Sequence, residues 1–273
     1  MDYNLSRIKQ IAEELRENGV SVPGKSRPPP SMAEIPQETD ISISKSSRSR
    51  KYLPQWLQAC RHDPALTVTR GLHCATDTND LPQDFMHLLL LHIRERLFPD
   101  RDDSEKIFIE SDTLYEHPIL NIEYTSYDIR REQDIVHLGY GRTGVMVYTP
   151  TLPGDEPWSY ANILAIYHVV VRTVSNPEPK RLTVLWVRWM ERSMSGLTGQ
   201  NSRNYTRISF VPWSDTPGST FDFVDPSHII RSCHIIPAFV LGRTTELLGP
   251  SMARDPEGDW CAYYANRYNL IIG

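Results

Sequence analysis

The glycine-rich string Gly139–Gly144 has the residue types that come nearest to phosphate-binding chemistry. Backbone N–H groups of such a turn, together with Arg142, could cradle an anion. A phosphoenzyme mechanism would need a cysteine thiolate three residues before the first glycine, and Val136 stands there. We therefore predict a glycine-rich β-turn that leads into Val145, with an inert anion-binding loop as the alternative.

Metal and hydrolytic chemistry would need clustered ligands, and the candidates have the wrong spacing. One residue separates Cys60 from His62 and none separates His73 from Cys74, whereas paired zinc ligands usually have about two to four residues between them. The chain has no P-loop, dinucleotide fingerprint, nucleophile elbow or His-Glu-x-x-His motif. We expect no metal, no cofactor and no enzymatic activity, and a hydrolase of unknown type stays open as an alternative.

Aromatic side chains concentrate on two neighbouring predicted strands. Trp186 and Trp189 point to opposite faces of one strand, so at least one should lie outside the core. Near acids such as Glu191, exposed rings could hold a methylated ammonium by cation–π attraction. The candidate partner-binding cage comprises Trp158, Tyr160, Trp186 and Trp189. The alternative places one tryptophan in the core and the other against the C-terminal tail.

Basic side chains gather in an arm at residues 41–62, which contains no acid. Such an arm could contact DNA phosphates or act as a nuclear-import signal, and a solvated tail is the alternative. The candidate nucleic-acid-binding residues are Lys45, Arg48, Arg50, Lys51, Arg130, Arg131 and Arg142.

Composition limits the class of protein. The chain has 273 residues, of which 40% are apolar and 23% charged, and its net charge is -5 at pH 7. This balance is typical of a folded core and excludes a generally polybasic binder. No apolar run approaches the ~18 residues of a spanning helix. We expect a soluble protein of the nucleus or cytoplasm with reduced thiols and no membrane contact.

Alternating runs of β-branched and aromatic residues predict strands throughout the middle of the chain. The predicted strands are 107–109, 120–127, 145–148, 158–171, 182–190, 207–211, 221–224 and, after a helical turn at Asp225–Pro226, 234–236. Their short spacing without intervening helices predicts an α+β, mainly β fold built on a small, bent antiparallel β-barrel. Closure of the barrel would remove exposed strand edges.

Flanking segments complete the predicted organisation. Residues 1–51 are expected to hold an amphipathic helix (4–18) and a disordered Pro/Ser/basic linker, and residues 52–104 a helical flank whose last helix ends near Phe98–Pro99. Residues 105–240 would form the barrel. The tail, 241–273, carries Trp260, Tyr263, Tyr264 and Tyr268 at helical spacing, which predicts a helix packed on the barrel, with a recognition surface as the alternative.

A set of ordered motifs carries a resemblance to a known family. The motifs are Tyr124–Asp134, Leu185–Trp189, Phe223–Pro226, Cys233–Phe239, Gly242–Thr244, Asp259–Trp260, Tyr263–Tyr264 and Asn266–Arg267. Over roughly residues 70–268 the chain resembles the C-terminal region of Plavaka-group transposase-related proteins of mushroom-forming fungi. It departs from that pattern at Gly139–Gly144 and after Arg267. The family's catalytic acids lie in a separate RNase H-like domain without a counterpart here, so the resemblance implies no catalysis.

The order of predicted strands is also similar to that of the bromo-adjacent homology domain. That resemblance implies a β-barrel that binds proteins or reads chromatin tails. The sequence analysis therefore predicts a non-catalytic interaction module with a protein or chromatin partner. A DNA-binding accessory domain that uses the basic arm is the alternative from a different class.

Overall fold

The computed structural model describes residues 40–45, 47, 49–66, 85–99, 105–125, 131–149, 158–192, 206–213 and 220–266. The chain divides into the compact units Met1–Gln37 and Glu38–Gly273, and every described residue belongs to the second. The expected helix at 4–18 lies outside the described residues.

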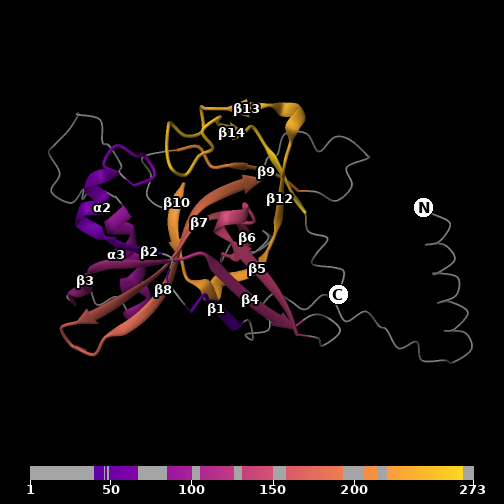
Figure 1. Cartoon of the computed structure of the whole chain (residues 1–273). Helices are drawn as coiled ribbons and strands as arrows, with labels where there is room; N and C mark the ends of the chain where they lie inside the picture. Colours follow the sequence, from indigo (N-terminus) through magenta and orange to yellow (C-terminus); the bar gives the residue numbers. More distant parts are fainter. Residues whose placement is uncertain are drawn as a thin grey trace, which may run out of the picture. The chain divides into compact units, whose positions relative to one another are not determined.

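The described part is mainly antiparallel β-structure (Figure 1). Its strands are β1 (Asp40–Ile43), β2 (Ser49–Tyr52), β3 (Ile107–His117), β4 (Ile119–Thr125), β5 (Arg131–His137), β6 (Gly144–Tyr148), β7 (Trp158–Thr173), β8 (Lys180–Arg192), β9 (Thr206–Phe210), β10 (Phe221–Val224), β11 (Ile229–Ser232), β12 (His234–Pro237), β13 (Arg243–Thr244), β14 (Asp259–Trp260) and β15 (Tyr263–Asn266). The helices are α2 (Leu53–Ala59), α3 (Phe85–Leu97) and the 3₁₀ turns η2 (Leu138–Tyr140), η3 (Pro226–His228) and η4 (Phe239–Leu241). No described helix has the length and apolar character needed to span a membrane.

The long hairpin of β7 and β8 is the centre of the fold, paired from Tyr160↔Met190 to Val171↔Lys180. Both of its faces are buried, which explains why its β-branched and aromatic residues are nearly continuous rather than alternating with polar ones. The hydrogen-bonded order is β11-β6-β7-β8-β9-β15-β12, with β3 also on β7, β10 on β8 and β2 on β3. A separate three-stranded sheet has the order β1-β4-β5.

Three hydrophobic clusters divide the core. On one face of the hairpin, α2 and α3 pack through Leu53, Phe85 and Leu89 against Trp186. On the other face, the sheet β1-β4-β5 packs against residues such as Leu185. The third cluster lies at the end of the hairpin where Tyr160 pairs with Met190, and it includes residues of β6, β7, β8, β9 and β15. Figure 1 shows the helices and the β4–β5 pair on different sides of the hairpin.

The prediction of a mainly β, antiparallel fold is confirmed, but a closed barrel is not found among the described strands. The hydrogen-bonded order ends at β11 and at β12. These two end strands are consecutive in the chain and are joined by Cys233, whose N–H donates to the Gly144 carbonyl at 2.9 Å. A bent segment therefore approaches β6 without completing a continuous ladder.

Two flanking segments differ from the sequence prediction. Residues 40–43 and 49–51, expected in the disordered linker, and Tyr52, expected in the helical flank, form β1 and β2 because they pair with the edges of β4 and β3. The tail, expected to be helical, forms β14 and β15. Pairing of β15 with both β9 and β12 satisfies its backbone groups, so tertiary context overrides the helical spacing of its aromatic residues. The predicted helix that ends near Phe98 is confirmed as α3.

Candidate functional site

The glycine-rich string forms a turn, as predicted. It contains η2 and Gly141, whose φ of 67° lies in the left-handed region. His137 Nδ1 accepts the Gly139 N–H at 3.1 Å, and the string leads into β6. The side chain of Arg142 is exposed.

The four predicted cage aromatics do not face one common space. Trp186 is buried against the rings of Phe221 and Phe223 on the helix side of the hairpin. Trp189 packs on the cluster of the opposite face, as expected for residues three apart on a strand. Tyr160 and Trp158 belong to the third cluster, where the Arg192 guanidinium lies 5.9 and 6.0 Å from their ring centroids.

The predicted nucleic-acid-binding residues are dispersed. Lys51 lies 3.6 Å from Glu116 and 4.9 Å from the Trp56 ring centroid, and Arg50 lies 5.4 Å from that of Tyr115. Arg48 and Arg130 lie outside the described residues. Arg131 is the first residue of β5, and the backbone of Arg142 forms an isolated β-bridge with His137, the last residue of β5. These two exposed cations are therefore roughly 20 Å apart along the strand. Lys45 is exposed and lines a cavity that is described below.

A cavity of about 560 Å³ brings together residues from β7, β9, β12, the η2 turn and the tail, and we name it the C-terminal pocket. Its lining combines three aromatic rings with two carboxylates and a single cation: Phe210, Trp260, Tyr263, Asp255, Asp259 and Arg254. Thr143 and Asn162 add polar groups, and the Thr143 hydroxyl donates to Asn162 Oδ1. Apolar residues such as Ile235 form the rest of the wall. The volume falls in the range of ligand-binding cavities.

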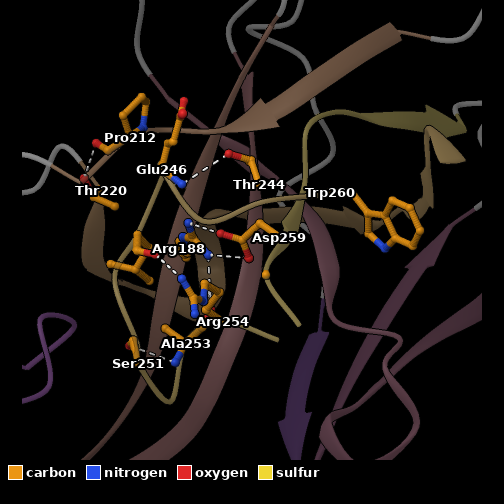
Figure 2. Close-up of polar contacts among 12 residues, drawn as sticks. Arg188, Pro212, Thr220, Thr244, Glu246, Ser251, Ala253, Arg254, Asp259 and Trp260 are labelled. Carbon is orange, nitrogen blue, oxygen red and sulfur yellow. Dashed lines mark hydrogen bonds and ion pairs between the residues drawn. The ribbon is translucent and has the colours of Figure 1, made fainter. Parts of the chain in front are cut away.

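A buried ion pair holds one wall of this pocket in place (Figure 2). Arg188, on β8, donates to both carboxylate oxygens of Asp259, at 3.1 and 2.8 Å, and to the Ala253 carbonyl at 3.2 Å. Its guanidinium also lies 4.0 Å from the ring centroid of Phe210. Arg188 is fully buried, and its Nε has no hydrogen-bond partner. Figure 2 shows the Trp260 side chain pointing away from this ion pair.

The loop before Asp259 has a second anchor. Asp63, after α2, accepts the Ser251 hydroxyl at 2.6 Å and the Met252 N–H at 2.7 Å. Arg254 donates to the Leu248 carbonyl at 2.6 Å. The pocket-lining loop is thus tied both to the helical side of the fold and to β8.

A cation already lies beside two of the pocket-lining residues, Trp260 and Asp255. The Arg243 guanidinium lies 4.4 Å from the Trp260 ring centroid, 3.2 Å from Asp255 and 3.5 Å from Glu257. The side chain of Asp255 is 63% exposed, so it has room for a further donor. Burial raises the pKa of Tyr263 to about 12. The phenol oxygen of Tyr263 accepts the backbone N–H of Trp260 at 3.2 Å.

Sequence reasoning missed part of this set. It named Trp260 and Tyr263 as aromatic and left open a recognition surface, but it named Asp259 only within the motif Asp259–Trp260 and did not name Phe210 or Asp255. The available signal was the interleaving of acids with aromatic residues between positions 255 and 263. Their convergence with Phe210 depends on the pairing of β15 with β9, which is a long-range contact.

Comparison with known proteins adds no family assignment. Among the described residues, no group of three or more His, Cys, Asp or Glu side chains could hold a metal ion. Scans against protein-family models, curated proteins and solved structures find no match to this chain.

Proposed function

We propose that this chain is a non-catalytic interaction module whose C-terminal pocket receives a cationic side chain, lysine or methylated lysine, from a protein partner. The observation that carries the proposal is the lining: three aromatic rings beside two carboxylates in a cavity of about 560 Å³. Aromatic faces attract ammonium groups, and the attraction is strongest where water is excluded.

Contacts inside the protein support this chemistry. Trp260 and Phe210 each hold an arginine of the same chain against the ring. The carboxylate of Asp255 is shared with a single exposed arginine, Arg243, so an incoming cation can compete for it or join it. An ammonium over Trp260 and beside Asp255 would therefore repeat the arrangement that the Arg243 guanidinium already adopts.

The resemblance to Plavaka-group transposase-related proteins and to the bromo-adjacent homology domain supports a chromatin partner, and hence a place in the nucleus. Both resemblances serve only as support for this proposal. Histone tails are lysine-rich and extended, so they are suitable first probes.

A histone-peptide array with unmodified and methylated lysines tests the proposal. We expect the wild type to bind at least one lysine peptide and Trp260→Ala to lose that binding by about tenfold or more, because the cation–π contact is removed. Tyr264→Ala is the matched control, since Tyr264 is an aromatic residue of the neighbouring strand β15 that does not line the pocket. Absence of binding by the wild type, or equal losses in both variants, would count against the proposal.

Direct DNA binding is the second candidate function, favoured by the exposure of Arg50, Arg131 and Arg142. It requires an affinity that falls steeply with salt because phosphate contacts release counterions. Changing these arginines to glutamine should flatten the salt dependence of binding to a duplex oligonucleotide. A salt response that does not change in the variant would contradict this function.

A further inference from the structure

We propose that a second cavity, which we name the β1 pocket, binds a phosphomonoester carried by a partner protein. The cavity measures about 420 Å³ and lies where β1, the start of β8 and η3 come together. The lining residues that matter here are Ser42, Ser44, Lys45, Arg181, Thr183 and Pro226. This site shares no lining residue with the C-terminal pocket.

The charges of the β1 pocket favour an anion. Lys45 and Arg181 are both exposed, and no carboxylate is among the lining residues. Two nearby acids are paired with other cations: Asp225, before η3, pairs with Arg96, and Glu116, on β3, pairs with Lys51. Asp40, on β1, and Glu123, opposite it on β4, are not among the lining residues, so no lining acid compensates the two cations.

A hydrogen-bond chain through the core orients two of the pocket residues. Arg181 Nη2 lies 3.3 Å from His168 Nδ1, and because arginine can only donate, that nitrogen is the acceptor. His117 Nε2, 2.6 Å from the same atom, must then carry the proton, so His117 Nδ1 accepts from the Ser44 hydroxyl at 3.3 Å. His117 is fully buried, and Tyr115 stacks on His168 with ring centroids 4.4 Å apart. Hydrogen bonds to His168 and His117 thus hold the side chains of Arg181 and Ser44 in place.

The His168 imidazole in this chain remains neutral near neutral pH. Burial, followed by the neighbouring Arg181 and His117, lowers the pKa of His168 to about 4. A neutral imidazole leaves Arg181 as the charged group that faces the cavity. The hydroxyls of Ser42 and Thr183 supply further hydrogen-bonding groups, and Ser42 Oγ accepts only the Asn121 side chain, at 3.5 Å, within the described residues.

The arrangement suits one phosphate group better than a nucleic-acid backbone. A phosphomonoester carries about -1.5 to -2 charges at pH 7, which two cations can balance. Duplex DNA instead presents a charge every ~1.7 Å and needs a continuous track of cations. Arg131 and Arg142 stand at opposite ends of β5, so they provide no such track.

Titration with inorganic phosphate and with phosphoserine, followed by calorimetry or NMR, tests the site in the full chain. We expect Lys45→Gln and Arg181→Gln each to weaken binding by about tenfold, because each removes a charge-assisted contact. Arg172→Gln is the matched control: it removes one positive charge from an exposed pair with Glu110, outside the pocket, and should leave the affinity unchanged. Binding of phosphoserine should also tighten as pH rises through the second pKa of its phosphate group, about 6.

Three outcomes would overturn the proposal. The first is no phosphate binding by the folded wild type, and the second is an equal loss in all three variants, which would indicate a net-charge effect. The third is preference for a duplex oligonucleotide over phosphoserine, with a salt dependence that all three variants share, which would indicate nucleic-acid binding. Unfolding midpoints of the three variants should match that of the wild type, since all three substituted side chains are exposed.

Discussion

At the residue scale, the buried ion pair between Arg188 and Asp259 is the interaction on which we expect the stability of the fold to depend most. A fully buried guanidinium is stable only when its charge is balanced, and Asp259 balances it through two hydrogen bonds. The pair also joins β8 to the loop that lines the C-terminal pocket. The same two side chains therefore stabilise the fold and fix one wall of the proposed binding site.

Removing one partner of this pair should be costly. Asp259→Asn leaves Arg188 buried and uncompensated, and we expect the free energy of unfolding to fall by about 3–5 kcal/mol. Arg243→Gln is the control, because its pairs with Asp255 and Glu257 are exposed and should contribute less than about 1 kcal/mol. Denaturant titration measures both. A loss for Asp259→Asn no larger than for Arg243→Gln would contradict this account.

A partly buried histidine, His92, should make the fold sensitive to acid. Burial, then Arg96, lowers the pKa of His92 to about 4, with Asp225 opposing. Between pH 6.5 and 4 the unfolded chain binds a proton that the folded chain does not, so stability is present above pH 6.5 and is lost on acidification. Asp222, whose pKa is raised to about 6 by burial, acts in the opposite direction.

The test compares unfolding midpoints at pH 7 and pH 5. For the wild type, His92 should account for about 2 kcal/mol of the stability lost over this interval. His92→Leu should lose less stability than the wild type, because it has no imidazole to protonate. Equal losses in the two proteins would show that His92 does not cause the acid sensitivity.

At the scale of elements, the close approach of β6 to the bent segment between β11 and β12 depends on a missing side chain. A Cβ at Gly144 would lie 2.5 Å from Ile235 Cδ1 and 2.7 Å from the Cys233 carbonyl oxygen. The Cys233 carbonyl belongs to the backbone, so it cannot move away from the added Cβ as the flexible side chain of Ile235 can. Gly144 therefore allows the two ends of the strand order to come together.

Gly144→Ala should separate these strands and lower the free energy of unfolding by about 1–3 kcal/mol, as overpacking does in cores. Gly249→Ala is the matched control, because a Cβ there meets nothing within 4 Å and no left-handed φ constrains it. The control should be neutral or slightly stabilising, since alanine restricts the unfolded chain. Similar unfolding midpoints for the two variants would contradict the proposed role of Gly144.

Some elements were predictable from local pattern and others were not. The strands β7 and β8 and the helix α3 have long runs of apolar residues with clear composition or period, so sequence reasoning located them. β1, β2 and β15 are four residues each, and their apolar pattern is weak. They are strands because a longer partner strand offers them an edge, which no local window can show.

At the scale of the whole molecule, the segment before α2 completes two different sheets. β1 adds Ile41 and Ile43 to the cluster beneath the three-stranded sheet, and β2 covers the edge of β3. β1 also supplies Ser42, Ser44 and Lys45 to the β1 pocket. A segment with the composition of a linker is thus part of the folded unit.

Truncation tests this role. A chain that begins at Leu53 should be less stable than a chain that begins at Glu38 by at least about 2 kcal/mol, because it exposes apolar surface that the two isoleucines cover. The chain that begins at Glu38 is the control, since it keeps the whole second compact unit. Thermal or denaturant unfolding of both gives the comparison. Equal stability would mean that β1 and β2 add nothing to the folded unit.

The amino-acid sequence by itself determined the antiparallel, mainly β class, the glycine turn before β6 and the opposite orientation of Trp186 and Trp189, because these features depend on near neighbours and on burial periodicity. Only the tertiary structure decided which distant groups meet. It paired Arg188 with Asp259, 71 residues away, and set Lys45 beside the same cavity as Arg181. Such meetings follow from strand register and from the need to balance buried charge, and both are properties of the assembled chain.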